Sequence, residues 1–260
     1  MTGSRIHLGS VPLVGDEPAE AQPSTRPLFL LADSQLLFWD DADGRFVHRL
    51  ARLAGGGAFR AVYLGASNGD QPEYYQLFQA AMAGTGAECR MIPAVPSSDD
   101  MAFLRSAGLV LLAGGDVQRG WTAFERSGVR EAVAQRHQEG AVLVGVSAGA
   151  VQLGMAGWPE GRTAELFATW GLVPFLVGAH AEEGDWAELR AAVRAHDGQA
   201  VGFGIPRGGG MAYHPDGTVE PIRHPLVEVR AVDGRVTTAM VLPSSARAGD
   251  ADGEGEAEGT

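Results

Sequence analysis

A serine in a sharp turn is the strongest chemical signal in this sequence. Residues 141–153 read Ala-Val-Leu-Val-Gly-Val-Ser-Ala-Gly-Ala-Val-Gln-Leu, an apolar run that leads through Gly-x-Ser-x-Gly into a helix-forming stretch. This is the layout of a nucleophile elbow centred on Ser147. The flanking glycines matter because a serine on so tight a turn has strained backbone and leaves no room for neighbouring Cβ atoms. We therefore expect Ser147 to act as a nucleophile, with the amide of Ala148 facing the oxyanion formed by its attack.

The pattern by itself is not specific in so glycine-rich a chain. With 37 Gly and 12 Ser in 260 residues, it arises by chance in about one such chain in four. An ordinary strand-to-helix turn with a buried serine is therefore an open alternative. The apolar run at 142–144 favours the elbow, because it is suited to a buried parallel strand directly before the serine.

A second glycine turn precedes the elbow. Residues 111–116 read Leu-Leu-Ala-Gly-Gly-Asp, an apolar strand pattern that ends in two glycines. Ligands of open α/β sheets collect at the carboxyl ends of the strands, where glycines let a backbone N–H approach the substrate. Gly115 is therefore predicted to be the second oxyanion donor beside Ala148, although an ordinary glycine-rich turn would have the same sequence.

One histidine stands out as a general base. His180 follows the apolar run 172–177 and lies 33 residues after Ser147, so a base at a neighbouring strand end could take the serine proton. His214 and His224 precede turn-forming residues, which favours the surface for both. A purely structural role for His180 is the competing interpretation.

Composition excludes several other chemistries. The chain has no Lys, which removes phosphate loops, Ser-Lys pairs and Schiff bases. Cys89 is the single cysteine and lies in a strand-like run, so we expect a buried structural thiol and no disulfide. There is no His-Glu-x-x-His pattern, and we expect neither a metal nor a cofactor. The net charge of −12 argues against nucleic acid and anionic membranes as partners. Without a basic segment and apolar core at the N-terminus, no signal peptide is expected, which favours the cytoplasm.

Apolar runs alternate with helical stretches along most of the chain. Strands are predicted at 27–32, 59–64, 87–92, 108–112 and 141–146, and helices at 72–83 and 121–138. This alternation predicts an α/β fold with a doubly wound, mostly parallel sheet. Asp216-Gly217 and Asp233-Gly234 are hairpin signals, so residues 201–242 should add an antiparallel C-terminal extension to that sheet.

Three segments are predicted from composition. Residues 1–26 are rich in Pro, Glu, Ser and Thr and are expected to form a loose N-terminal arm. Residues 27–243 should form one domain, because no internal linker interrupts them. Residues 244–260 consist largely of Gly, Ala and acidic residues and are expected to form a disordered acidic tail.

Taken together, Ala-Gly-Gly-Asp at 113–116, Gly-Val-Ser-Ala-Gly-Ala at 145–150 and His180 resemble the S51 serine peptidases. This is the family of aspartyl dipeptidase (peptidase E) and cyanophycinase, whose fold is similar to that of class I glutamine amidotransferases. The resemblance covers about residues 27–240. It implies a hydrolase that forms an acyl-enzyme on Ser147, with His180 as base, and that cleaves small aspartyl or isoaspartyl peptides. A serine at the elbow, where the amidotransferases have cysteine, argues against the release of ammonia from glutamine.

The sequence departs from the family pattern after the histidine. Relatives commonly have Gly-Ile-x-Glu, whereas residues 204–207 read Gly-Ile-Pro-Arg. The resemblance places an acid between the serine and the histidine, and Glu160 is predicted to orient His180, with Glu165 as the next choice. Arg207 is expected to bind a substrate carboxylate, because a guanidinium does so in bidentate fashion. Asp116 and Gln118 are also expected to contact the substrate.

A homodimer is the expected oligomeric state. Two alternative functions stay open. One is a catalytically impaired homologue that binds an acidic peptide or metabolite, which the arginine at position 207 favours. The other is an α/β-hydrolase-like esterase, in which His214 or His224 would be the base. Only about 95 residues separate Ser147 from the last predicted strand, which leaves little room for that topology.

Overall fold

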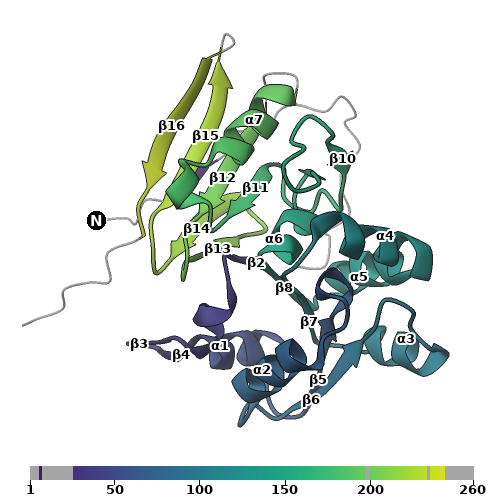
Figure 1. Cartoon of the computed structure of the whole chain (residues 1–260). Coiled ribbons are helices and arrows are strands. Elements are labelled where there is room, and N and C mark those ends of the chain that lie inside the picture. Colours follow the sequence, from purple (N-terminus) through teal and green to yellow (C-terminus); the bar gives the residue numbers. More distant parts are fainter. Residues whose placement is uncertain (1–5, 8–25, 197–199, 233–234, 244–260) are drawn as a thin grey trace, which may run out of the picture.

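A computed structural model of the chain describes residues 6–7, 26–196, 200–232 and 235–243. Its largest sheet has eight strands in the order β1-β14-β13-β2-β8-β7-β5-β6 (Figure 1). Five neighbouring strands run parallel: β2 (Leu28–Leu31), β8 (Val142–Val146), β7 (Leu109–Leu112), β5 (Phe59–Leu64) and β6 (Ala87–Ile92). Three strands extend it in antiparallel fashion: β13 (Gly210–Tyr213), β14 (Thr218–Ile222) and β1 (Ile6–His7). The predicted α/β fold with a mostly parallel sheet is confirmed.

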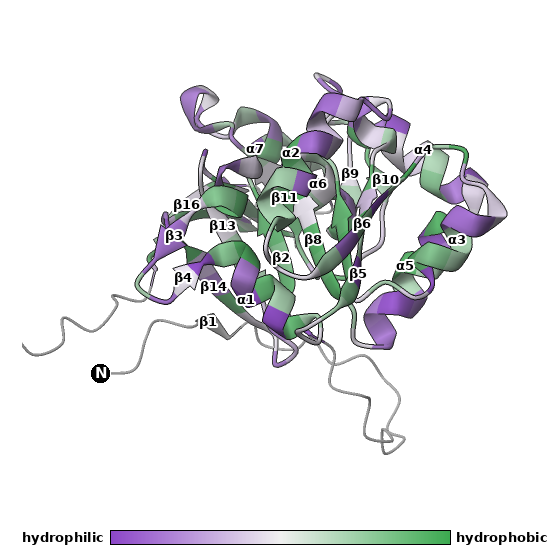
Figure 2. Ribbon diagram, turned by 90° about the horizontal axis from the view of Figure 1, so that it is seen from below, coloured by the Kyte–Doolittle hydropathy of each residue, from purple (hydrophilic) through white to green (hydrophobic). Residues whose placement is uncertain are grey.

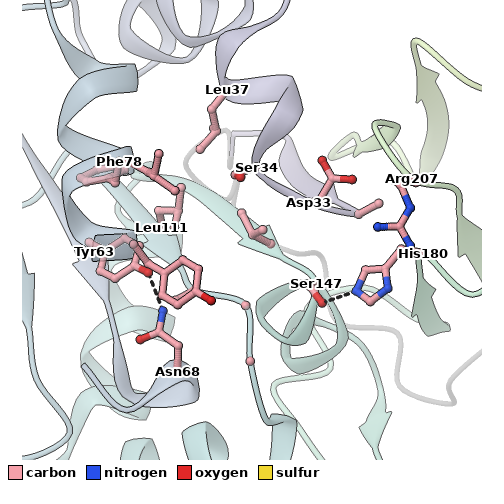
Figure 3. Close-up of a pocket in the computed structure, with 17 residues that line it drawn as sticks. Asp33, Ser34, Leu37, Tyr63, Asn68, Phe78, Leu111, Ser147, His180 and Arg207 are labelled. Atoms are coloured by element: carbon pink, nitrogen blue, oxygen red, sulfur yellow. Dashed lines mark hydrogen bonds between the residues drawn. The ribbon is translucent and has the colours of Figure 1, made fainter. Parts of the chain in front are cut away.

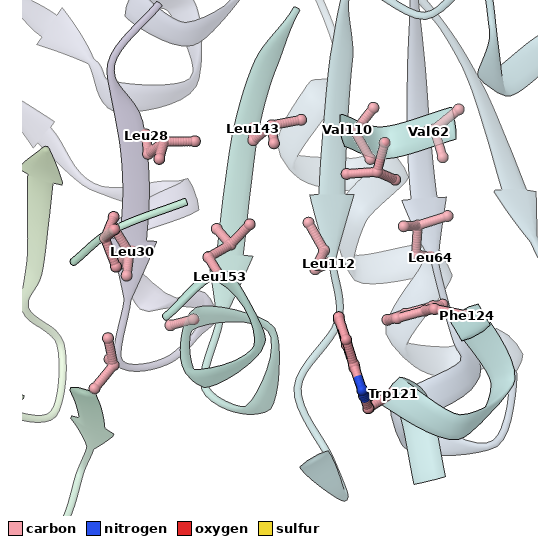
Figure 4. Packing of buried hydrophobic residues seen from close by; sticks show 14 of the residues in the cluster. Leu28, Leu30, Val62, Leu64, Val110, Leu112, Trp121, Phe124, Leu143 and Leu153 are labelled. Carbon is pink, nitrogen blue, oxygen red and sulfur yellow. The ribbon is translucent and has the colours of Figure 1, made fainter. Parts of the chain in front are cut away.

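The central strands are apolar without interruption because both faces of the sheet are covered. All residues of β2, β7 and β8 are buried. Alternate side chains face opposite layers, so that Leu30 and Leu143 belong to one core cluster and Leu31 and Val144 to the other. Figure 4 shows the first cluster between the strands and the helices, and Figure 2 shows apolar strands inside more polar helices.

Helices cover the two faces of the parallel sheet. On the side of the first cluster lie α3 (Ser98–Leu104), α4 (Val117–Ser127), α5 (Val129–Gln138) and α6 (Ala148–Leu153). On the other side lie α1 (Phe46–Leu53), α2 (Pro72–Met82) and the 3-10 turn η1 (Ser34–Phe38). The predicted helix at 121–138 is divided in two at Gly128, whose φ of +76° ends α4 in a left-handed conformation.

The C-terminal strands differ from the expected single extension. Only the β13–β14 hairpin joins the main sheet, whereas four other strands form a second sheet: β11 (Leu176–Ala179), β12 (Val201–Ile205), β15 (Leu226–Val232) and β16 (Arg235–Val241). The chain passes from one sheet to the other through 206–209, where Gly208 has a φ of +69°. Helix α7 (Ala187–Ala195) packs on the second sheet.

The remaining elements are short. They are η2 (Ala66–Asn68), η3 (Glu182–Gly184), the pair β3 (Asp40–Asp41) with β4 (Gly44–Arg45), and the pair β9 (Ala156–Gly157) with β10 (Phe167–Ala168). Within the described ranges, no helix is long and apolar enough to cross a membrane.

Within the predicted N-terminal arm, Ile6–His7 form a two-residue strand that pairs with β14. The other residues of the arm that fall in 1–5 and 8–25, the acidic tail at 244–260 and the turn at 233–234 lie outside the described residues.

Candidate active site

The candidate site lies where ends of strands from both sheets meet. Strand β8 ends at Val146, directly before Ser147, and its neighbour β7 leads into Gly114 and Gly115. In the second sheet, β11 ends at Ala179, directly before His180. The site is therefore assembled at the carboxyl ends of strands from two different sheets, where α/β folds bind their ligands (Figure 1).

Ser147 has the strained backbone of a nucleophile elbow. Its φ and ψ are 50° and −109°, a region that costs a non-glycine residue about 1–3 kcal/mol. Its N–H donates to Leu31 O at 2.9 Å, which ties the turn to β2. The glycines are required by packing, since a Cβ at Gly145 would lie 2.5 Å from Gly149 O, and one at Gly149 would lie 2.3 Å from Leu112 O. The Gly-x-Ser-x-Gly pattern thus has the structural cause that the sequence suggested.

His180 lies within hydrogen-bonding distance of the serine. The distance from its Nε2 to Ser147 Oγ is 2.8 Å (Figure 3). The histidine backbone is itself in the left-handed region, with a φ of 43°, and its N–H donates to Ile205 O at 2.9 Å. This backbone bond fixes the turn after β11 to β12. The 2.8 Å contact between the side chains brings the predicted nucleophile and the predicted base together.

Two backbone amides lie beside the serine. Gly115 has a φ of +131°, and a Cβ there would lie 2.3 Å from Ser67 O, so only glycine fits. Ala148 is the first residue of α6 and follows Ser147 directly. Across the part of the chain that the structure describes, neither amide donates a hydrogen bond to a protein group. Both residues line a cavity with Ser147, as an oxyanion hole requires.

A buried polar network holds the glycine turn in place, and the sequence analysis did not find it. Gln152 Nε2, on α6, donates to Val117 O at 2.9 Å and to Ser67 Oγ at 3.1 Å. Ser67 O in turn accepts the N–H of Asp116 at 2.9 Å. Ser67 and Gln152 are both fully buried. A signal existed, since Gln152 is the only polar side chain of α6.

Two cavities open beside the dyad of Ser147 and His180. The first has a volume of about 280 Å³, and its charged side chains are Asp33, His180 when protonated, and Arg207. The second has a volume of about 320 Å³ and is acidic. Its lining includes Asp116, Glu160 and Glu188.

Within the described ranges, the predicted triad acid Glu160 makes no hydrogen bond to the histidine. Glu160 is exposed and lines the second cavity, and Glu165 pairs with Arg162 at 2.8 Å. Among the described residues, no carboxylate is hydrogen-bonded to His180. The structure therefore brings together a Ser–His dyad.

Of the residues predicted to contact the substrate, Arg207 and Asp116 each line a cavity, and Gln118 does not. Arg207 lines the first cavity, and its backbone N–H donates to Glu182 Oε1 at 3.2 Å. Its guanidinium makes no ion pair with any residue in the described ranges. Asp116 lines the second cavity and caps α4 by accepting the N–H of Arg119 at 2.7 Å, whereas Gln118 lines neither cavity.

The two histidines of the esterase alternative lie elsewhere. His214 Nε2 is 2.8 Å from Glu220 Oε2, and neither His214 nor His224 lines a cavity with Ser147. The geometry therefore gives no support to either histidine as the base.

Comparison with known proteins agrees with this geometry. The model of peptidase family S51 matches residues 28–216, which include the elbow, the glycine turn and His180. The chain belongs to peptidase family S51. No curated protein matches it.

Two solved structures share the fold of this S51 chain. The crystal structure of a peptidase from an acI-B1 Actinobacterium has a TM-score of 0.64 at 15% identity, and the alignment covers 84% of this chain and 97% of that one. A putative peptidase E protein from Listeria monocytogenes EGD-e has a TM-score of 0.52 at 13% identity, with 84% and 100% covered. At identities of 13–15%, the TM-scores above 0.5 establish a common fold and nothing more. The family assignment supports a peptidase activity.

Proposed function

We propose that this S51 chain is a serine-type peptidase that cleaves short acidic peptides through an acyl-enzyme on Ser147. The observation that carries the proposal is the 2.8 Å contact between Ser147 Oγ and His180 Nε2 at the strand ends. A nucleophile and a base within hydrogen-bonding distance are the minimum requirement for activating a serine. The strained elbow supports the same interpretation, because strained backbone is concentrated at functional sites.

The reaction follows from the positions of these groups. Ser147 Oγ attacks the scissile carbonyl carbon while His180 Nε2 takes the hydroxyl proton. The amides of Gly115 and Ala148 donate to the oxyanion of the tetrahedral intermediate. As the C–N bond breaks, His180 returns its proton to the leaving amine, and an ester on Ser147 remains. A water molecule then attacks this ester with His180 again as base, which releases the acid and restores the serine.

Arg207 supports the acidic part of the proposal. Its guanidinium lines the same cavity as Ser147 and has no ionic partner in the described part of the chain. A carboxylate of a short substrate, on a side chain or at the terminus, would supply that partner through paired N–H···O bonds. On this proposal, Arg207→Gln raises KM for acidic dipeptides more than it lowers kcat, because the guanidinium contributes to binding.

A fluorophosphonate probe provides the direct test, because it labels only an activated serine. We expect the wild-type protein to be labelled and to hydrolyse acidic dipeptides, and Ser147→Ala to lose both properties while it keeps its circular dichroism spectrum. His180→Gln should lower the labelling rate by about 100-fold or more, the usual contribution of a general base.

The matched control is Ser98→Ala, since Ser98 is exposed at the start of α3, away from both cavities. Its labelling should equal that of the wild type. If the wild-type protein were folded yet neither labelled nor active on the dipeptides, the proposal would be wrong. A homologue that binds acidic peptides without cleaving them would then be the better description.

A further inference from the structure

The first cavity has an apolar inner part that the proposed chemistry does not use. Away from Ser147 it is lined by Leu37, Tyr63, Phe78 and Leu111, each of which is at most 4% exposed (Figure 3). These side chains come from η1, β5, α2 and β7, so the inner part lies between four elements of the core. It is a recess in the protein interior that is continuous with the nucleophile.

The rim of the cavity is also apolar. Tyr74 and Leu77 project from α2 three residues apart, and they are 50% and 45% exposed. Both line the first cavity. Large apolar side chains left in water beside a recess indicate a surface that is covered when a ligand binds.

The polar groups of the inner part are neutral. Asn68 Nδ2 donates to Tyr63 Oη at 2.7 Å. Burial raises the pKa of Tyr63 to about 12, so the phenol keeps its proton at neutral pH. The charged side chains that line the cavity are Asp33, His180 when protonated, and Arg207, of which His180 contacts Ser147 directly. A buried carboxylate among the apolar side chains would lack a counter-charge, which is costly.

Building on the proposed function, we infer that the first cavity is a side-chain pocket for a large apolar or aromatic residue next to the scissile bond. The substrate class is then a short peptide that combines such a residue with a carboxylate bound by Arg207. The whole first cavity, which includes the space beside Ser147 and Arg207, has a volume of about 280 Å³, and roughly 150 Å³ suffices for a benzene ring. The neutral Tyr63–Asn68 pair accepts a ring with a polar tip, such as that of tyrosine.

Binding to the inert Ser147→Ala protein tests this pocket without requiring turnover. Isothermal titration calorimetry would compare Asp-Phe with Asp-Ala and Asp-Glu, and Phe-Asp with Ala-Asp and Glu-Asp. We expect the phenylalanine peptide to bind about 10- to 100-fold more tightly than the alanine peptide in at least one of the two orders, as burial of a benzyl group predicts. The glutamate peptide should bind more weakly than either. Affinities within threefold in both orders would overturn the inference.

Two substitutions place charge in the pocket. Leu77→Glu changes an exposed rim position, and Asn68→Asp is nearly isosteric, so neither needs to disturb the fold. Each should reduce the preference for phenylalanine to less than threefold. Val95→Glu is the control, because Val95 is 87% exposed and does not line the first cavity. Val95→Glu should keep the full preference, and loss of the preference in this control as well would count against the pocket.

The fluorophosphonate probe separates failure of the pocket from failure of the proposed function. Labelling of wild-type Ser147 without an apolar preference in binding would overturn the pocket and leave the serine peptidase standing. A clear apolar preference without labelling would keep the pocket and overturn the catalytic proposal.

Discussion

Two residues with unusual backbone carry the candidate chemistry. Ser147 and His180 have φ values of 50° and 43°, and each is held by a backbone hydrogen bond to a neighbouring strand, at Leu31 O and Ile205 O. In a triad, a carboxylate on the histidine ring fixes the tautomer and the orientation. Here the main chain holds His180, and no carboxylate of the described residues is hydrogen-bonded to its ring. The dyad is therefore positioned by the turns that carry it.

Substitution of Glu160 tests this conclusion at the residue scale. We expect Glu160→Gln to lower kcat/KM by less than about tenfold, because the carboxylate is not bonded to His180. Replacing the acid of a working triad by its amide costs about 10⁴-fold in kcat. Steady-state kinetics on the best dipeptide would measure the difference, with Glu165→Gln as the matched control. A loss near 10⁴-fold in Glu160→Gln alone would restore Glu160 as the orienting acid.

At the scale of elements, one buried glutamine connects the parts of the site. Gln152 extends from the elbow helix α6 to the start of α4 and to η2. Ser67 of η2 then binds the turn that carries Gly115. A network of this kind is worth most when every member is satisfied, since the low dielectric makes unpaired polar groups expensive.

The substitution Gln152→Leu removes that connection. We expect the free energy of unfolding to fall by about 1–3 kcal/mol, because Ser67 and Val117 O lose a buried partner. The kcat should fall more than KM changes, since the Gly115 amide is proposed to donate to the oxyanion of the transition state. Urea denaturation and steady-state kinetics would measure the two effects. In the exposed control Gln138→Leu, stability should stay within about 0.5 kcal/mol of the wild type. An unchanged kcat in Gln152→Leu would show that the network does not position the turn.

At the scale of the whole molecule, Ser147 and His180 follow strands of two different sheets that share a common core. Phe175 packs edge-to-face on Phe203 of the second sheet at 4.8 Å and on Tyr213 of the main sheet at 5.6 Å. One cluster of buried side chains includes residues of both sheets. Because this core is shared, we expect the site to form only when both sheets are folded together, as the predicted single domain at 27–243 requires.

The unfolding of the wild-type protein and of a Phe175 variant tests whether the two sheets unfold as one cooperative unit. We expect Phe175→Ala to lower the free energy of unfolding by about 3–5 kcal/mol, the usual cost of deleting a fully buried aromatic ring. Tryptophan fluorescence and far-ultraviolet circular dichroism should report one coincident transition in urea for the wild-type protein. Phe38→Ala is the control, because Phe38 is 43% exposed and its loss should cost much less. Two separate transitions in the wild type would mean that the sheets are independent domains.

The sequence by itself determined the features that depend on near neighbours. Uninterrupted apolar runs such as 142–146 defined the central strands, because a strand buried on both faces needs no polar residue. The glycines around Ser147 defined the elbow, because only glycine allows the close approach of Gly149 to Leu112 O. The choice of His180 also came from the sequence, and the structure places it against Ser147.

Only the tertiary structure decided the features that depend on distant neighbours. The division of the C-terminal strands into two sheets follows from which strand each one pairs with, and alternating side chains do not specify that partner. Glu160 and His180 line the same cavity without a hydrogen bond between them, an arrangement that spacing along the chain does not encode. The apolar pocket arises because four elements converge, and each of its side chains reads as ordinary core in the sequence. Contacts between distant segments therefore determine the shape and lining of this site, whereas local sequence determines the sharp turn that carries Ser147.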